Sequence, residues 1–108
     1  MAELDMGPVA SVVCEVIEER RRQFAKFGDQ SHLPDGTGGE LTRLLAGRAR
    51  EVTDAAAKAG ELTFRLILRE EVFEAFAETD PVRLRAELIQ VEAVANQWIE
   101  AIDRRGGR

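Results

Sequence analysis

The chain has 108 residues, 44% hydrophobic and 32% charged, which is enough for one folded domain and unlike a disordered segment. We expect a single domain over residues 1–108. The net charge of -5 argues against polymeric nucleic acid and an anionic membrane surface as partners. Because we find no secretory signal and no membrane-spanning apolar run, and because one cysteine permits no intrachain disulfide, we expect a soluble, cytoplasmic protein.

The first predicted helix opens at Pro8, carries apolar residues at three- and four-residue steps, and ends before Gly28. Cys14 lies within that apolar pattern, so we expect a buried and inert thiol. Residues 28–39 hold four Gly and one Pro, which predicts a loop without regular structure. Its length, about 12 residues, is the length at which a loop in a small domain is often functional.

The second helix is predicted from about Glu40 to Ala59, with Gly60 as its natural end. Its apolar stripe is thinner than that of the first helix, and small Ala side chains within it allow another helix to approach closely. The residues of this stripe are Leu41, Leu44, Leu45, Val52, Ala55, Ala56 and Ala59.

The third helix is predicted from the N-cap Thr63 to about Thr79, and Asp80-Pro81 starts a fourth that runs to about residue 103. We expect residues 104–108 to fray. Because the connection between the last two helices is short, they must form an antiparallel hairpin. The predicted fold is all-α, a four-helix antiparallel bundle that dimerises through helix faces, since so thin a protomer gains most from a partner chain.

The third helix carries glutamates on its apolar side. On a wheel of about 100° per residue with Phe64 at zero, Glu71 falls near -20°, inside the apolar stripe. Glu74 and Glu70 follow on one shoulder of that stripe. A carboxylate facing a core is costly unless it is paired or bound to a metal. No Lys or Arg occupies positions that would neutralise all three.

The fourth helix repeats this anomaly, because Glu87 shares a column with Val91 and Trp98, and Gln90 lies on the outer side of that column. Two facing helices with such side chains can surround a hard cation with oxygen ligands. We therefore predict a Mg²⁺ site, with Mn²⁺ as a possible substitute, which would bind nucleotide phosphates through the metal. The competing interpretation is a solvated acidic helix edge.

Two acidic segments resemble a family signature. They read Glu70-Glu71-Val72-Phe73-Glu74 and, after twelve residues, Glu87-Leu88-Ile89-Gln90. This is similar to the EExxE, spacer and ExxD pattern of the all-α NTP pyrophosphohydrolases, the MazG-like relatives of dimeric dUTPases. Residues 19–32, ERRRQFAKFGDQSH, resemble the opening of the small bacterial and phage members, and residues 84–103 resemble the same subgroup.

The resemblance implies a homodimer or a dimer of dimers that hydrolyses an NTP or dNTP to the monophosphate and pyrophosphate. By the motif match, Glu71, Glu74 and Glu87 are metal ligands, and Glu70 is a ligand or orients the attacking water. Glu70 and Glu71 are thus the expected catalytic residues. Lys26 and Gln30 belong to the matching N-terminal segment, and the resemblance places Lys26 near the phosphates or the base.

One position departs from the family pattern, because Gln90 stands where the last motif acid belongs. Its amide oxygen is still a candidate metal ligand, but one negative charge is lost. The alternative function is therefore a nucleotide-binding or regulatory protein with weakened or lost catalysis. A third interpretation is a purely structural helical dimer.

Two polar residues outside the acidic motif are further candidates for nucleotide contacts. His32, the only histidine, lies in the Gly- and Pro-containing loop, where it contacts a base or phosphate or else caps a turn. Asn96 is placed on the fourth helix, from which it can reach the site or the nucleotide. The expected substrate-binding set is Lys26, Gln30, His32 and Asn96.

Overall fold

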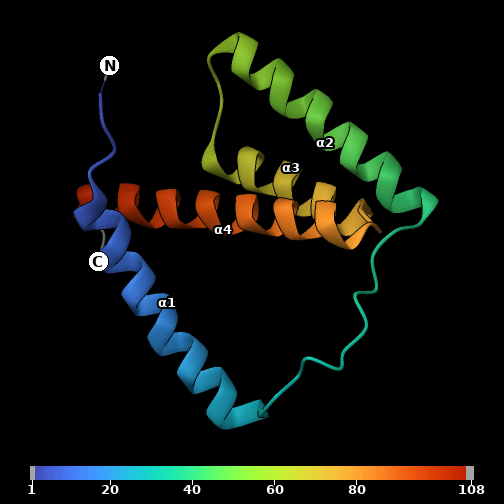
Figure 1. Cartoon of the computed structure of the whole chain (residues 1–108). Coiled ribbons are helices and arrows are strands. Elements are labelled where there is room, and N and C mark those ends of the chain that lie inside the picture. Colours follow the sequence, from blue (N-terminus) through green and yellow to red (C-terminus); the bar gives the residue numbers. More distant parts are fainter. Residues whose placement is uncertain (1, 107–108) are drawn as a thin grey trace. The chain divides into compact units, whose positions relative to one another are not determined.

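The structure, a computed structural model, describes residues 2–106, and this part of the chain contains four α-helices and no strand (Figure 1). The helices are α1 (Met6–Phe27), α2 (Glu40–Ala59), α3 (Phe64–Ala77) and α4 (Pro81–Arg104). The predicted all-α class with four helices is confirmed. Within the described range, no helix combines the length and the apolar character that crossing a bilayer requires.

The start of α1 differs from the prediction by two residues. The Asp5 carboxylate accepts a hydrogen bond from the Gly7 N–H at 3.0 Å, so Asp5 is the N-cap and Met6 is the first helical residue. Pro8 lies inside the first turn instead of opening it. A proline is tolerated there because the first N–H groups of a helix have no partner within the helix.

The ends of α3 and α4 are set by polar side chains. The Thr63 hydroxyl accepts from the Leu66 N–H at 3.1 Å and caps α3, as predicted. At Glu78 the backbone turns extended, so α3 ends at Ala77, two residues before the predicted end. The Asp80 carboxylate then accepts from the Arg83 N–H at 3.1 Å and starts α4. Residues 78–80 alone connect the two helices.

The C-terminal segment is more regular than predicted. Arg104 belongs to α4 instead of a frayed tail, and Arg105 and Gly106 continue into a turn. The Gly106 N–H donates to the Asp103 carbonyl at 2.9 Å, and the left-handed φ of +74° at Gly106 permits this turn. Positions 107 and 108 of the predicted tail lie outside the described residues.

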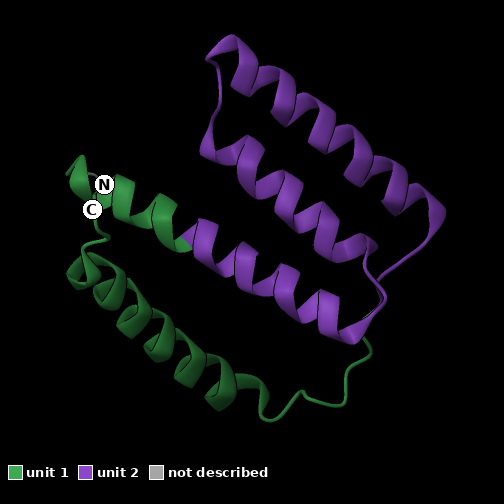
Figure 2. Ribbon diagram, turned by 45° about the horizontal axis from the view of Figure 1, so that its top comes forward, with its two compact units in different colours: residues 1–35, 96–108 green, residues 36–95 purple. Residues whose placement is uncertain are grey.

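The chain divides into two compact units (Figure 2). The terminal unit holds the residues up to Asp35 and those from Asn96 onward, and the central unit holds residues 36–95. In the terminal unit, the start of α1 lies beside the end of α4, and Val12 is its buried apolar residue (Figures 1 and 2). Cys14 is exposed, so the predicted burial is wrong: two residues correspond to about 200°, which turns Cys14 away from Val12.

In the central unit, α3 lies between α2 and the first turns of α4 (Figure 2). The buried residues of α2 are Ala49 and Thr53, one turn apart. The Thr53 hydroxyl lies 2.9 Å from the Ala49 carbonyl and 3.2 Å from the Leu66 carbonyl of α3 and donates to both. Small side chains on α2 thus allow close approach, but they are Ala49 and Thr53 and not the predicted alanines of the apolar stripe. That stripe is wrong, because its leucines and two of its three alanines are exposed.

Candidate metal centre

The central position of α3 determines the environment of its glutamates. Every residue from 66 to 74 is half-buried, and Ala75 is fully buried, because α2 covers one side of this helix and α4 covers the other. The sequence EEVFE at positions 70–74 therefore places three carboxylates within a helix that has little free surface. Glu70, Glu71 and Glu74 all lie partly out of solvent.

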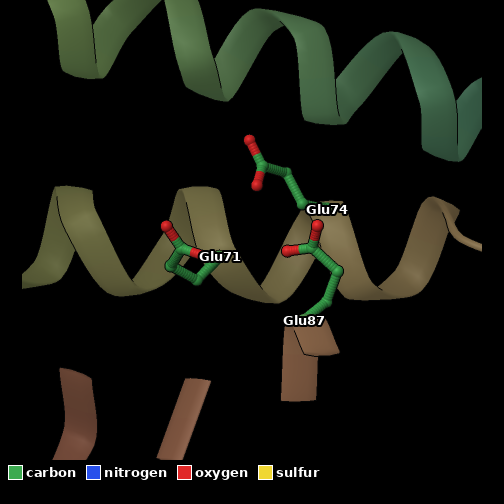
Figure 3. Close-up of side chains that lie close together, drawn as sticks. All are labelled: Glu71, Glu74 and Glu87. Carbon is green, nitrogen blue, oxygen red and sulfur yellow. The ribbon is translucent and has the colours of Figure 1, made fainter. Parts of the chain in front are cut away.

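Three of the predicted ligands converge. One carboxylate oxygen each from Glu71, Glu74 and Glu87 lies within 4.8 Å of the other two. Figure 3 shows the first two side chains leaving adjacent turns of α3 and the third approaching from α4. The short connection at residues 78–80 makes this possible, because it folds α4 back along α3. We call Glu71, Glu74 and Glu87 the carboxylate triad.

Burial and nearby negative charge raise the pKa of two members of the triad, Glu71 and Glu87. Burial raises the pKa of Glu71 above its usual value, and the negative charges of Glu74 and then Glu87 raise it further. Burial likewise raises the pKa of Glu87, followed by the charge of Glu74. A group with a raised pKa is one whose negative charge is poorly stabilised by its surroundings. A bound cation would supply the missing positive charge.

Two oxygens of the triad also lack hydrogen-bond partners. Glu71 Oε2 and Glu87 Oε2 are buried from solvent, and no described residue donates a hydrogen bond to either. An ionised carboxylate oxygen that is buried without a donor is costly. Because such oxygens are the ligands that Mg²⁺ and Mn²⁺ prefer, the donor set fits a hard divalent cation.

The fourth motif acid, Glu70, is held differently. Its carboxylate lies 3.9 Å from Arg50 Nε, and it is not a member of the converging triad. Burial raises the pKa of Glu70, and the charges of Glu74 and Asp54 add to this effect, while Arg50 opposes it. Gln90, one turn beyond Glu87 on α4, is exposed.

Arg50 of α2 is a site residue that the sequence prediction missed. Its Nη2 donates to Glu74 Oε1 at 2.7 Å, and Figure 3 shows the Glu74 side chain extending toward α2. Arg50 thus pairs with Glu70 and Glu74, whereas Glu71 and Glu87 make no ion pair within the described residues. Arg50 lies three residues before Thr53, close to the small-residue face of α2. This position could have indicated its role only if the sequence had shown that this face meets α3.

The predicted substrate-binding residues lie in the terminal unit. Lys26 is exposed near the end of α1, with its Nζ 5.2 Å from the centroid of the Phe27 ring. Gln30 and His32 are exposed in the loop, where the Gln30 carbonyl accepts from the Leu33 N–H at 3.0 Å. Asn96 is half-buried on α4, and its Oδ1 is buried without a hydrogen-bond partner among the described residues. The structure therefore does not gather these four residues with the triad in one compact unit.

Comparisons of the chain with known protein families, with characterised proteins and with solved structures give no match. The resemblance to the MazG-like pyrophosphohydrolases consequently rests on the motif residues themselves. The geometry of Glu71, Glu74 and Glu87 is an observation independent of that resemblance.

Proposed function

We propose that the protein is a Mg²⁺-dependent nucleoside triphosphate pyrophosphohydrolase of the MazG-like type, which releases a nucleoside monophosphate and pyrophosphate. The observation that carries this proposal is the convergence of Glu71, Glu74 and Glu87 from two helices within 4.8 Å. The two buried carboxylate oxygens without donors support it, because a solvated acidic edge would leave such oxygens in water.

Each acidic residue has a distinct place in this proposal. The triad would hold the cation, with Glu71 and Glu74 on α3 and Glu87 opposite them on α4. A bound Mg²⁺ supplies neutralisation of the negative charge on the phosphate oxygens and favours attack by water. Glu70 would orient that water, and the raised pKa of its carboxyl brings it closer to the range in which a carboxylate accepts a proton efficiently.

The direct test is an assay of purified protein with Mg²⁺ or Mn²⁺ against a panel of NTPs and dNTPs. Pyrophosphate release that disappears in Glu71→Gln is the expected result. Glu92→Gln is a matched control, because Glu92 is exposed on α4 and lies about 140° around the helix from Glu87. Absence of pyrophosphate with every substrate, or equal activity in the wild type and Glu71→Gln, would contradict the proposal.

A second candidate is a nucleotide-binding or regulatory protein whose catalysis is weakened or lost. The observation that favours it is Gln90, which is neutral and exposed next to a site with three converging carboxylates. Calorimetric titration with nucleotide and Mg²⁺ separates the two functions. Binding without turnover in the wild type, together with turnover in Gln90→Asp, identifies the weakened site.

We also propose that the functional unit is a homodimer or a dimer of dimers. Large apolar side chains are exposed on α1 and α2, with 61% of Phe24 and 69% of Leu41 accessible to solvent. Light scattering after size exclusion measures the assembly. We expect the double change Ile17→Ser and Phe24→Ser to lower the oligomeric mass, whereas Leu4→Ser, at an exposed position before α1, leaves it unchanged. A monomeric wild-type chain would contradict this proposal.

A further inference from the structure

The guanidinium of Arg50 is paired with Glu74, one of the three carboxylates that would bind a cation. Its Nη2 lies 2.7 Å from Glu74 Oε1, and its Nε lies 3.9 Å from Glu70 Oε1. The two glutamates are 18% and 16% exposed at their side chains, whereas the Arg50 side chain is 64% exposed. A largely exposed guanidinium therefore pairs with two carboxylates that are mostly covered by the packing of the helices.

Glu74 has two competing uses. It belongs to the carboxylate triad, and it also accepts the short, charge-assisted hydrogen bond from Arg50. A divalent cation coordinated by Glu74 experiences repulsion from the guanidinium and withdraws electron density from the same carboxylate. Cation binding and the Arg50–Glu74 pair thus oppose each other.

Arg50 is free to leave this pair. Most of its side chain is in solvent, so its release disrupts little packing. Asp54 lies one turn further along α2 and already attracts Arg50 electrostatically. Oppositely charged side chains at this spacing on an exposed helix surface attract each other weakly, so Asp54 offers Arg50 another partner.

We propose that Arg50 is an internal counter-ion of the acidic cluster, which a divalent cation must displace from Glu74, and that Arg50 thereby limits the cation affinity of the site. This inference rests on the proposed metal centre. It assigns Arg50 a positioning role: the residue neutralises part of the charge of the acidic cluster and weakens the affinity of the cluster for a metal. The weak binding has a use, since a site that holds its cation loosely responds to the arrival of a ligand that brings phosphate oxygens to the metal.

The test is calorimetric titration of the full chain with MnCl₂ in low-salt buffer at neutral pH, without nucleotide. Removing the guanidinium in Arg50→Met is expected to tighten Mn²⁺ binding by about three- to tenfold, the effect of one nearby charge on a divalent ion at a partly exposed site. Arg50→Lys retains the charge and is expected to stay within about twofold of the wild type.

Arg48→Met is the matched control. Arg48 lies on the same helix, its side chain is 73% exposed, and it pairs with Glu51 at 3.3 Å, away from the cluster. We expect no change in Mn²⁺ affinity for this variant. Arg50→Gln serves as a second neutral replacement, and circular dichroism confirms that each variant folds.

The outcomes separate this inference from the proposed function. If the wild type binds Mn²⁺ through Glu71, as shown by loss of binding in Glu71→Gln, but the two neutral Arg50 variants bind equally or more weakly, Arg50 is not a competitor and the metal centre stands. If only the neutral Arg50 variants bind measurably, the competition is confirmed in its strongest form. If no variant binds Mn²⁺, both the metal centre and the role of Arg50 are refuted.

Discussion

The two sides of α3 satisfy their polar groups in opposite ways. Toward α2, the Thr53 hydroxyl reaches a carbonyl of α3, and Arg50 pairs with Glu74. Toward α4, like charges face each other, and the buried Oε2 atoms of Glu71 and Glu87 have no donor among the described residues. One contact contains complementary groups, and in the other burial and the negative charge of Glu74 raise the pKa of both Glu71 and Glu87.

This difference separates a contact that stabilises the central unit from one that, under the proposed function, binds the cation. Helix contacts selected for stability pair their buried polar groups, because each unpaired group costs about 1–3 kcal/mol. A contact that leaves carboxylates unpaired breaks this rule, and natural proteins break it mainly at functional sites. The α2–α3 contact therefore has the character of a scaffold, and the α3–α4 contact is where we propose that the cation binds.

The largest expected effect tests the α4 side directly. Glu71→Gln keeps the shape of the side chain but removes one anionic ligand from the triad. We expect pyrophosphate release to fall by about 100-fold or more, which corresponds to about 2.7 kcal/mol in the activation free energy. Initial rates at saturating Mg²⁺ measure this effect. A fall of less than threefold would mean that the triad is not the reaction centre.

The next effect tests the α2 side as a scaffold. Ala49 is buried one turn before Thr53, so Ala49→Leu introduces three heavy atoms where α2 closely approaches α3. We expect a loss of about 1–3 kcal/mol in the free energy of unfolding. Urea denaturation followed by circular dichroism measures it. Ala57→Leu, at an exposed position on the same helix, is the control and should change stability little.

Most of the fold was predictable because helix ends have local causes. Thr63, Asp80 and Pro81 mark the α3 and α4 boundaries with residue types that cap or open helices. The errors arose where a local signal was ambiguous. Pro8 is compatible with several positions in a first turn, and the exposure of Cys14 depends on which face of α1 is covered. Similarly, the buried face of α2 is determined by its partner helix, which its own sequence does not specify.

In the candidate site, too, the residues placed by local sequence signals were predictable, and those placed by helix packing were not. Glu71, Glu74 and Glu87 were predictable because their helical spacing and a three-residue connection bring them together. Arg50 was missed because an ion pair between α2 and α3 can be predicted only when the alignment of the two helices along each other is known. The nucleotide-binding roles of Lys26, Gln30, His32 and Asn96 stay predictions, since these residues lie in the terminal unit and the triad in the central one.

A smaller effect concerns the stability of the protein without metal. Because the folded-state pKa values of Glu71 and Glu87 are raised, the native state binds protons more tightly than the unfolded chain. Their stabilising contribution is complete below the ordinary glutamate pKa of 4.5 and is lost as the pH rises through the raised values. We therefore expect Glu71→Gln to raise the stability of the metal-free protein at pH 7, although it should lower the proposed activity.

Denaturation curves between pH 5 and pH 7 in the presence of EDTA measure this effect. The gain from Glu71→Gln should be largest at pH 7 and shrink as the pH falls toward the ordinary glutamate pKa of 4.5, because the wild-type carboxyl takes up its proton on the way. Saturating Mg²⁺ at pH 7 should reverse the order of the two proteins, because only the wild type gains stability from the cation. A Glu71→Gln protein that is less stable than the wild type without metal would contradict the assignment of unpaired charge to this contact.

The smallest effect concerns the ion pair on the α2 side. Because the Arg50 side chain is 64% exposed, solvent and salt screen its attraction to Glu74, and Arg50→Met should lower the unfolding free energy by only about 0.5 kcal/mol. Parallel denaturation curves at low and at about 0.5 M NaCl should show that salt removes most of this difference. A loss of several kcal/mol would instead make Arg50 a structural member of the scaffold. The guanidinium would then be held too tightly to leave Glu74 when a cation binds.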